Sequence, residues 1–364
     1  MKYGHLERVK VSLTVKSPLY IGSGKKLSAM EYILEGGIVY VPSIPEMLDA
    51  FANAWQRGLS DDFVRFVMAP GREKKLSAFL KNHNIAVRQA SWVQYALRVQ
   101  PDINNMNTLL TFMRNPVGQA YIPGSSIKGA LRTALIAARI DDRSKRALVD
   151  ELNKKPGDRK ASAVEKTLRV LPCDVDKKDN AVNDLLKALE ISDSAPFPSE
   201  TLTVCRRHWL SVNGDDRSGR SPVFMECLRP GAETAFYLTI DHSLWPAGED
   251  ALLVIREALV EWDGLCRRAV DDHFARSLAE IGDMKGAPVV LGGGTGFQRK
   301  SLVYKTSDYP EQAAQLAHEV LRRQFTTRKG CTYQPKGAVI APYMYKAVRF
   351  EGECWPMGVC ELHM

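Results

Sequence analysis

The residues best placed to do chemistry lie at the start of a predicted helix within residues 121–135. An apolar segment ends there in a Pro-Gly pair, and Ser125 and Ser126 follow as candidate N-caps of the helix. The first amides of a helix lack partners within it and carry the positive end of the helix dipole. Lys128 and Arg132 are four residues apart and therefore share one helix face. Hydroxyls, amides and two cations together predict an anion site, and phosphate is its obvious ligand.

This segment departs from the nucleotide-binding P-loop. Gly124 and Gly129 have the P-loop spacing, but Ala130 and Leu131 follow where that loop has Lys and then Ser or Thr. The groups that would hold a terminal phosphate and magnesium are missing, so a nucleoside triphosphatase is disfavoured. The competing interpretation is an ordinary capped helix with one apolar face in the core. The residues that repeat at four positions to form that face are Ile127, Leu131 and Leu135.

Two glycine-rich segments also carry basic residues and are candidates for the same kind of ligand. The first consists of Gly22, Ser23, Gly24, Lys25 and Lys26. The candidates in the second are Gly292, Gly293, Gly294, Thr295, Gly296, Phe297, Arg299 and Lys300. Consecutive glycines let a backbone approach a ligand closely. The second segment is no dinucleotide loop, because Phe297 replaces the last glycine of that pattern and the segment follows a helix. A plain turn and a flexible structural loop stay open as alternatives.

The net charge of +8 is concentrated near the C-terminus. Residues 320–350 hold seven Lys and Arg and no Asp or Glu, and +8 minus seven leaves +1 for the rest of the chain. The interleaved aromatic residues are Phe325, Tyr333, Tyr343, Tyr345 and Phe350. A basic stretch with aromatics is typical of a polyanion-binding surface. The alternative is a surface whose arginines pair with acids elsewhere in the fold.

Composition predicts a folded protein of a reducing compartment. The chain has 364 residues, of which 45% are apolar and 25% charged, and this suits two domains or one elaborated core. The seven cysteines include no C-x-x-C pair, so neither a disulfide framework nor a zinc ribbon is indicated. No apolar run is long enough for a secretory signal or a membrane span. We therefore expect a cytoplasmic protein without membrane contact.

The apolar pattern predicts an α+β fold, with a ferredoxin-like (RRM-like) core, helical insertions and a C-terminal α/β extension. Alternating residues predict strands at 7–16, 31–41, 189–194, 202–205, 223–228, 234–240, 339–350 and 357–362. Helical periodicity predicts helices within 43–100, after the Pro-Gly pair, and over 249–281 and 310–325. The order of strand, helix, two strands, helix and strand is that of ferredoxin-like proteins.

The same pattern predicts how the chain divides. We expect the core to comprise residues 1–42 and 118–300, with a charged helical insert at about 141–187 that holds twelve Lys or Arg and ten Asp or Glu. Residues 43–117 are predicted to form a helical insertion, and residues 301–364 a basic C-terminal extension. No aromatic RNP1 signature is present, so base stacking on the sheet as in ordinary RRM proteins is not indicated.

Several motifs, spread over about residues 10–300, resemble those of RAMP proteins, the repeat-associated proteins of CRISPR effector complexes. They are SPLYIGSGKK at 17–26, YIPGSSIKGALRTAL at 121–135, ISDS at 191–194, ECLRPG at 226–231 and LGGGTGF at 291–297. The resemblance implies a subunit of the type III-A (Csm) complex that holds the 3′ part of the crRNA and caps the backbone filament. Its implied partners are the crRNA, the neighbouring RAMP backbone subunit, other Csm subunits and target RNA. By resemblance, Gly292, Gly293, Gly294, Thr295 and Phe297 would contact the guide.

We expect a binding subunit without catalytic residues, metal or cofactor. Asp61, Asp62 and Asp102 fall in loops or in the helical insertion, and the sequence places no base or metal ligand beside them. RAMP enzymes that process CRISPR RNA use a histidine near the N-terminus, and neither His5 nor His83 stands in an equivalent position. The remaining histidines have no metal-like spacing. The alternative from another class is a metal-independent endoribonuclease of the RAMP type.

Overall fold

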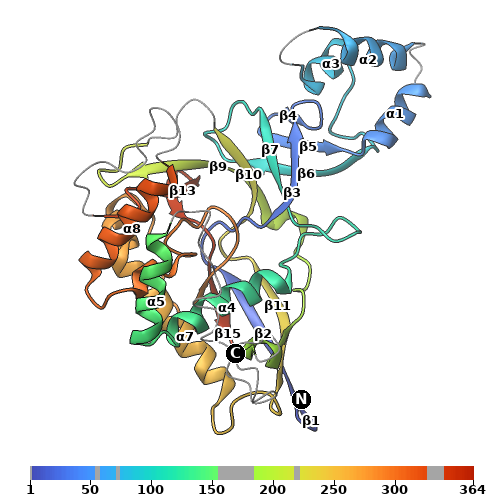
Figure 1. Cartoon of the computed structure of the whole chain (residues 1–364). Coiled ribbons are helices and arrows are strands. Elements are labelled where there is room, and N and C mark those ends of the chain that lie inside the picture. The colour runs from blue at the N-terminus through green and yellow to red at the C-terminus, as the bar shows by residue number, and fades with distance from the viewer. Residues whose placement is uncertain (1, 54–57, 71–73, 155–183, 217–221, 326–339) are drawn as a thin grey trace.

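The computed structural model describes residues 2–53, 58–70, 74–154, 184–216, 222–325 and 340–364. These residues form a mixed α/β fold built around two sheets (Figure 1). Within these ranges, no helix is both long and apolar enough to cross a membrane.

The first sheet has the strand order β12-β15-β2-β11-β8, with β1 paired to β2. Every neighbouring pair in it is antiparallel. Its strands are β1 (Lys2–Tyr3), β2 (Leu6–Val15), β8 (Leu189–Ile191), β11 (Glu233–Asp241), β12 (Ala287–Val290) and β15 (Val359–His363). Alternation in β2 buries Val11, Leu13 and Val15 completely, so one face of this sheet forms the main core.

Two helices cover that face, α4 (Gly124–Ala138) and α7 (Ala251–Ala269), and they pack against each other (Figure 1). Ile127, Leu131 and Leu135 of α4 are buried in the main core, as the spacing of four predicted. Asp250 caps α7 by accepting hydrogen bonds from the amides of Leu252 and Leu253. The apolar face of α4 is thus a structural feature, and only its remaining faces are available for ligands.

The second sheet has the order β3-β7-β10-β9-β6-β5-β4, and β13 pairs with both β9 and β14. Its strands are β3 (Gly22–Ser28), β4 (Ile33–Glu35), β5 (Ile38–Pro42), β6 (Val93–Val99), β7 (Thr108–Phe112), β9 (Leu202–Ser211), β10 (Val223–Leu228), β13 (Met344–Phe350) and β14 (Glu353–Pro356). Strand β6 runs parallel to β9 and β7 runs parallel to β10, whereas the other neighbouring strands of this sheet are antiparallel.

The remaining helices form two groups. The first, α1 (Ile44–Ala52), α2 (Leu59–Met68) and α3 (Leu76–Asn82), projects from the end of the second sheet near β4 and β5 (Figure 1). Its small core contains Phe51, Phe63 and Phe79, whose ring centroids lie 5.0–5.8 Å apart. The second group, α5 (Asp142–Asn153) and α8 (Pro310–Phe325), lies beyond α7 (Figure 1).

Several sequence predictions are wrong in detail. Residues 93–99 and 108–112 are strands, although the sequence pattern predicts a helical insertion over residues 43–117. The glycine-rich segment Gly22–Lys26 belongs to edge strand β3, with a register irregularity, and is no simple turn. The helix predicted over 249–281 ends at Ala269. Strands β3, β6 and β7 pair with strands far away in the chain. A periodic pattern among neighbouring residues cannot detect such pairing.

The predicted C-terminal extension adds strands to both sheets, because β13 and β14 join the second sheet and β15 joins the first. The predicted order of strand, helix, two strands, helix and strand occurs as β2, α4, β8, β11, α7 and β12. Other elements interrupt this order, since β3 to β7 and α1 to α3 come between β2 and α4, and β9 and β10 come between β8 and β11. In the first sheet, β15 lies between β12 and β2. Most of the charged insert predicted at 141–187 lies outside the described residues.

Candidate nucleic-acid interface

The predicted anion motif and both glycine segments contribute to one cavity of about 510 Å³. Its lining includes Gly22, Ser125, Ser126, Gly292, Gly293 and Lys300. These residues come from the start of β3, the first turn of α4 and the loop after β12, which are more than 90 positions apart in sequence from one another. The fold therefore brings together three segments that the sequence interpretation could only associate by composition.

The first turn of α4 differs from the predicted cap. The helix begins at Gly124 with Pro123 as N-cap, and Pro123 makes no capping hydrogen bond through its side chain. The amide of Gly124 donates to Asp193 Oδ1 at 2.8 Å, and the amide of Ser126 donates to the carbonyl of Pro123. Neither serine is therefore the N-cap. Because the amides of Gly124 and Ser126 are already bonded, Ser126 contributes mainly its hydroxyl group to the cavity, which Ser125 also lines.

The basic pair of α4 lies at a neighbouring cavity of about 340 Å³, which Lys128 and Arg132 line with Asp184. Lys128 Nζ donates to the carbonyl of Leu189 at 2.8 Å, and Arg132 forms an ion pair with Asp184 at 3.0 Å. Burial lowers the pKa of Lys128, with the nearby carboxylates of Asp184 and Glu190 opposing that shift. The two cations share one face as predicted, but both already have partners in the protein.

The glycine loop after β12 packs against the protein through its glycines. Gly293 donates its amide to the carbonyl of Tyr20 at 2.7 Å. A Cβ on Gly292, whose φ is +79°, would lie 2.1 Å from that same carbonyl oxygen, and a Cβ on Gly294 would lie 2.3 Å from Met357 Sδ. The absence of side chains here first serves close packing against Tyr20 and Met357. Contact of these glycines with RNA stays a prediction.

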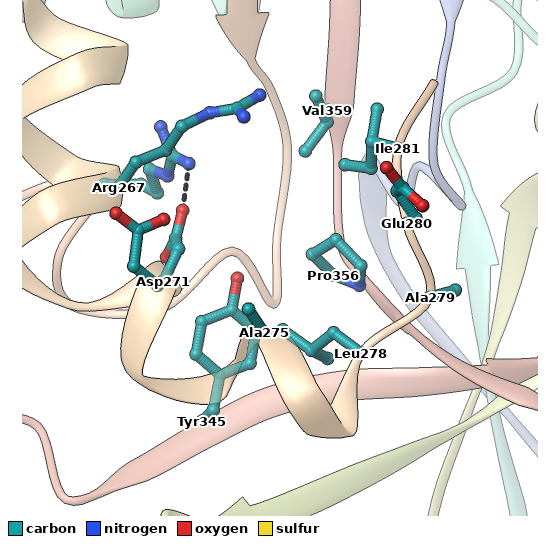
Figure 2. A pocket seen from close by; sticks show the side chains of 12 residues that line it. Arg267, Asp271, Ala275, Leu278, Ala279, Glu280, Ile281, Tyr345, Pro356 and Val359 are labelled. Atoms are coloured by element: carbon teal, nitrogen blue, oxygen red, sulfur yellow. Dashed lines mark hydrogen bonds and ion pairs between the residues drawn. The ribbon is translucent and has the colours of Figure 1, made fainter. Parts of the chain in front are cut away.

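The end of the loop is anchored by a buried ion-pair network. Arg299, 9% exposed, bonds to Asp263 of α7 at 2.5 Å and also to Asp271. Burial alone would lower the pKa of Arg299, but the two carboxylates raise it above its ordinary value. Burial also raises the pKa of Asp271. Figure 2 shows Asp271, Arg267 and Tyr345 around the adjoining cavity of about 510 Å³. Arg299 is committed to this network, so we leave it out of the proposed RNA contact.

The other predicted residues of the loop have different surroundings. Phe297 packs against Tyr304, with ring centroids 6.3 Å apart at 75°, in a hydrophobic cluster. Thr295 is a buried residue of the loop that lines the cavity, and the φ of Gly296 is +89°. Lys300 is exposed and lines the main cavity. Lys300 is therefore the cation of the loop that remains available for an anionic ligand.

The first glycine segment contributes less than predicted to the cavity. Within it, Gly22 lines the cavity, while Ser23, Gly24, Lys25 and Lys26 continue along the exposed edge strand β3. Ser23 Oγ lies 2.6 Å from Thr111 Oγ1 of the neighbouring strand β7. The side chains of Lys25 and Lys26 are exposed beside the cavity rather than within its lining.

Six basic residues of the stretch at 320–350 fall into three groups with different surroundings. Arg322 and Arg323 form ion pairs with Glu319 of the same helix, as the structural alternative predicted. Arg328, Lys329 and Lys336 lie outside the described residues. Lys346 lies in β13 opposite Trp209 of β9, two positions from Arg207. The sequence interpretation missed Arg207 and Trp209, although the alternation in β9 was a signal that they share one face.

Three histidines that lie beside carboxylates, His5, His208 and His242, occupy two separate places. Buried His208 lies between two carboxylates, with Nδ1 2.7 Å from Asp216 Oδ2 and Nε2 3.6 Å from Asp102 Oδ2. The sequence interpretation found no base beside Asp102, and the position of His208 corrects it. The pair was missed because His208 belongs to β9, which is distant from Asp102 in the chain. His5 and His242 are exposed where β2 begins and β11 ends, and the amide of His242 donates to the carbonyl of His5. Among the described residues, no group of three His, Cys, Asp or Glu is placed to hold a metal ion.

Comparisons with solved structures support this architecture. A chain of the structure described as "Cryo-EM structure of Csm-crRNA-target RNA ternary complex in type III-A CRISPR-Cas system" matches with a TM-score of 0.66 and 17% identity, covering 97% of this chain and 100% of that one. The crystal structure of T.onnurineus Csm5 matches with a TM-score of 0.60 and 18% identity, covering 96% of this chain and 99% of the other.

Sequence relatives match over similar lengths. The CRISPR system Cms protein Csm5 of Mycobacterium tuberculosis (strain ATCC 25618 / H37Rv) is 26% identical over 388 aligned residues, with 98% of each chain covered. Csm5 of Streptococcus thermophilus is 27% identical over 318 residues, covering 82% of this chain and 81% of the relative. The sequence profile of the RAMP superfamily matches residues 12–335, which span all three segments of the cavity. The chain therefore belongs to the RAMP superfamily.

Proposed function

We propose that this protein is a crRNA-binding structural subunit of a cytoplasmic type III-A CRISPR interference complex. In this proposal it holds the 3′ part of the guide, caps the backbone filament next to a RAMP backbone subunit and supports crRNA maturation and antiviral defence. The observation that carries it is the convergence of the α4 serines, the glycine loop and the start of β3 on one cavity. Membership of the RAMP superfamily and likeness to Csm5 proteins along the whole chain support it.

The chemistry of the cavity suits a sugar–phosphate backbone. Ser125 and Ser126 can donate to phosphate oxygens or share hydrogen bonds with ribose hydroxyls, and Lys300 supplies positive charge at the same lining. Such contacts do not depend on base identity, which a subunit that must accept any guide requires. Lys25 and Lys26 extend the positive charge along β3.

We also propose that the first sheet is a modified ferredoxin-like core. The order β2, α4, β8, β11, α7 and β12 follows the ferredoxin-like sequence of elements. In this interpretation β15 has entered the sheet between β12 and β2 and moved β12 to the edge. The insertion ties the C-terminus to the loop after β12, because the amide of Leu291 donates to the carbonyl of Gly358, which directly precedes β15.

The proposed role is non-catalytic, and the specific alternative is a metal-independent endoribonuclease. His5 and His242 are exposed where β2 begins and β11 ends, and they pair with the carboxylates of Asp241 at 3.7 Å and Glu7 at 2.8 Å respectively. Two such groups could in principle exchange protons with a ribose hydroxyl. They lie outside the lining of the proposed cavity, so we favour binding without cleavage.

The test is titration of purified protein with labelled guide-length single-stranded RNA in EDTA at several salt concentrations. We expect binding with a steep salt dependence and intact RNA. Lys300→Ala should reduce the slope of log affinity against log salt by about 1. Ser125→Ala with Ser126→Ala should weaken binding with little change of slope.

The matched control is Lys81→Ala in α3, an exposed cation on the projecting helical group, which should leave both quantities unchanged. Equal slopes for wild type, Lys300→Ala and Lys81→Ala would remove the cavity from the proposal. Discrete cleavage products that disappear in His5→Ala would replace the binding role with the endoribonuclease.

A further inference from the structure

A basic and aromatic cluster lies on one face of the second sheet, where β13 runs beside β9 (Figure 1). Lys346 is the direct cross-strand partner of Trp209, and Val348 is the partner of Arg207. Because side chains alternate along a strand, Arg207, Trp209 and Lys346 share one face. The Arg207 guanidinium carbon lies 5.4 Å and Lys346 Nζ 5.0 Å from the centroid of the Trp209 ring. We call these three residues the β9–β13 cluster.

The cluster carries unbalanced positive charge. Burial lowers the pKa of Arg207, and burial together with the charges of Arg207 and Lys300 lowers the pKa of Lys346. Within the described residues neither Arg207 nor Lys346 has an ion pair to a carboxylate, and Arg207 Nε is buried without a hydrogen-bond partner. Partly buried like charges repel each other, and buried donors without partners are costly. A bound anion would reduce the repulsion between the two cations and would also give the buried donor a hydrogen-bond acceptor.

Lys300 connects this cluster to the cavity of the glycine loop. It lines that cavity, and its charge also acts on Lys346. Positive charge therefore extends from Lys300, at the lining of the glycine-loop cavity, to Lys346 of β13 and Arg207 of β9. A small anion would need only one end of this path, whereas a polyanion with regularly spaced charges can occupy both.

We propose that the β9–β13 cluster is a second subsite for the same single-stranded RNA, in which Lys300, Lys346 and Arg207 hold a backbone phosphate and Trp209 positions the two strand cations. This inference rests on the proposed function, because the RNA that enters the cavity is the ligand that continues onto the sheet. The site reads no base, since each contact is to the phosphate. Trp209 is a positioning residue, whose ring fixes both cations on the same side of the sheet through cation–π contacts.

The test is the salt titration with guide-length RNA on Lys346→Gln and, independently, Arg207→Gln. Each change should weaken binding about tenfold, because a charge-assisted contact to phosphate is lost. Each should also lower the salt slope by about 1. Trp209→Leu should weaken binding by less and leave the slope unchanged, because every cation remains but is less well oriented. A purely structural role of these residues would not change the slope.

The matched control is Lys305→Gln, since Lys305 is already paired with Glu261. A thermal unfolding midpoint for each variant identifies changes that act through folding, and Lys346→Arg should restore the slope lost in Lys346→Gln. Lys300→Ala and Lys346→Gln combined should lose less than the sum of the two single changes, because both cations hold one phosphate.

One result would overturn the subsite and leave the proposed function intact. In it, Lys346→Gln and Arg207→Gln both bind RNA with wild-type affinity and salt slope, while Lys300→Ala still binds RNA more weakly. A wild-type protein that binds no RNA would overturn both. Polyglutamate serves as a probe for an acidic protein partner. Loss of polyglutamate binding in Lys346→Gln, with RNA binding unchanged, would assign the cluster to a protein and refute the RNA subsite.

Discussion

Two groups of cations in this protein have opposite surroundings. Arg299 is buried between Asp263 and Asp271, and its charge is balanced within the protein. Arg207 and Lys346 are partly buried beside each other without such a carboxylate among the described residues. We infer from the comparison that a basic residue is available for a ligand contact where the fold leaves its charge uncompensated. Balanced cations build the site, and unbalanced ones are available to bind.

The largest expected effect comes from breaking the balanced group. Arg299→Met should lower the free energy of unfolding by about 3–5 kcal/mol, because it leaves Asp263 and Asp271 buried without their cation. Urea unfolding measures this loss. Arg267→Met is the control, since Arg267 pairs with the same Asp263 but is 44% exposed and should cost less than about 1 kcal/mol. Equal losses in the two variants would mean that Arg299 is no internal anchor.

A smaller effect is expected at the glycine that packs the loop. Gly292→Ala should destabilise the protein by more than the roughly 1–2 kcal/mol of a left-handed residue, because its Cβ would lie 2.1 Å from the Tyr20 carbonyl oxygen. Gly248→Ala provides the control, with φ +83° and no atom within 4 Å of the added Cβ. The difference between their unfolding free energies isolates the clash. A zero difference would show that the loop can move away from Tyr20.

The smallest effect is expected for the cation pair of α4. Arg132→Gln should change the salt slope of RNA binding by less than Lys346→Gln, because Arg132 already pairs with Asp184. The same RNA titration compares the two variants directly. If Arg132→Gln lowers the salt slope by the amount expected for one lost phosphate contact, then an ion pair within the protein does not predict which cations bind RNA. That result would restore Lys128 and Arg132 to the interface that their spacing first predicted.

Local patterns predicted the elements whose residues carry their own periodicity. The strand at Leu6–Val15, the apolar face of α4 and the helix at Pro310–Phe325 are confirmed, because alternation and a repeat of about four need only near neighbours. Strands β6 and β7 were missed, because each is stabilised by pairing with strands more than 50 positions away in sequence. The strand at Gly22–Ser28 was missed because an exposed edge strand tolerates glycine and lysine.

The sequence by itself determined the family motifs, the start region of α4 and the presence of glycine loops with basic neighbours. Helix packing and strand pairing place Ser125, Ser126, Arg299 and Lys300 at one cavity, and they leave Arg299 buried and paired but Lys300 exposed. Only the tertiary structure decided that Arg207 and Lys346, 139 positions apart (346 minus 207), lie on adjacent strands. The physical reason is that charge compensation depends on which residues meet in space. Spacing along the chain determines which side chains share one face of a helix or strand. Strand pairing and helix packing determine which side chains of other elements they meet.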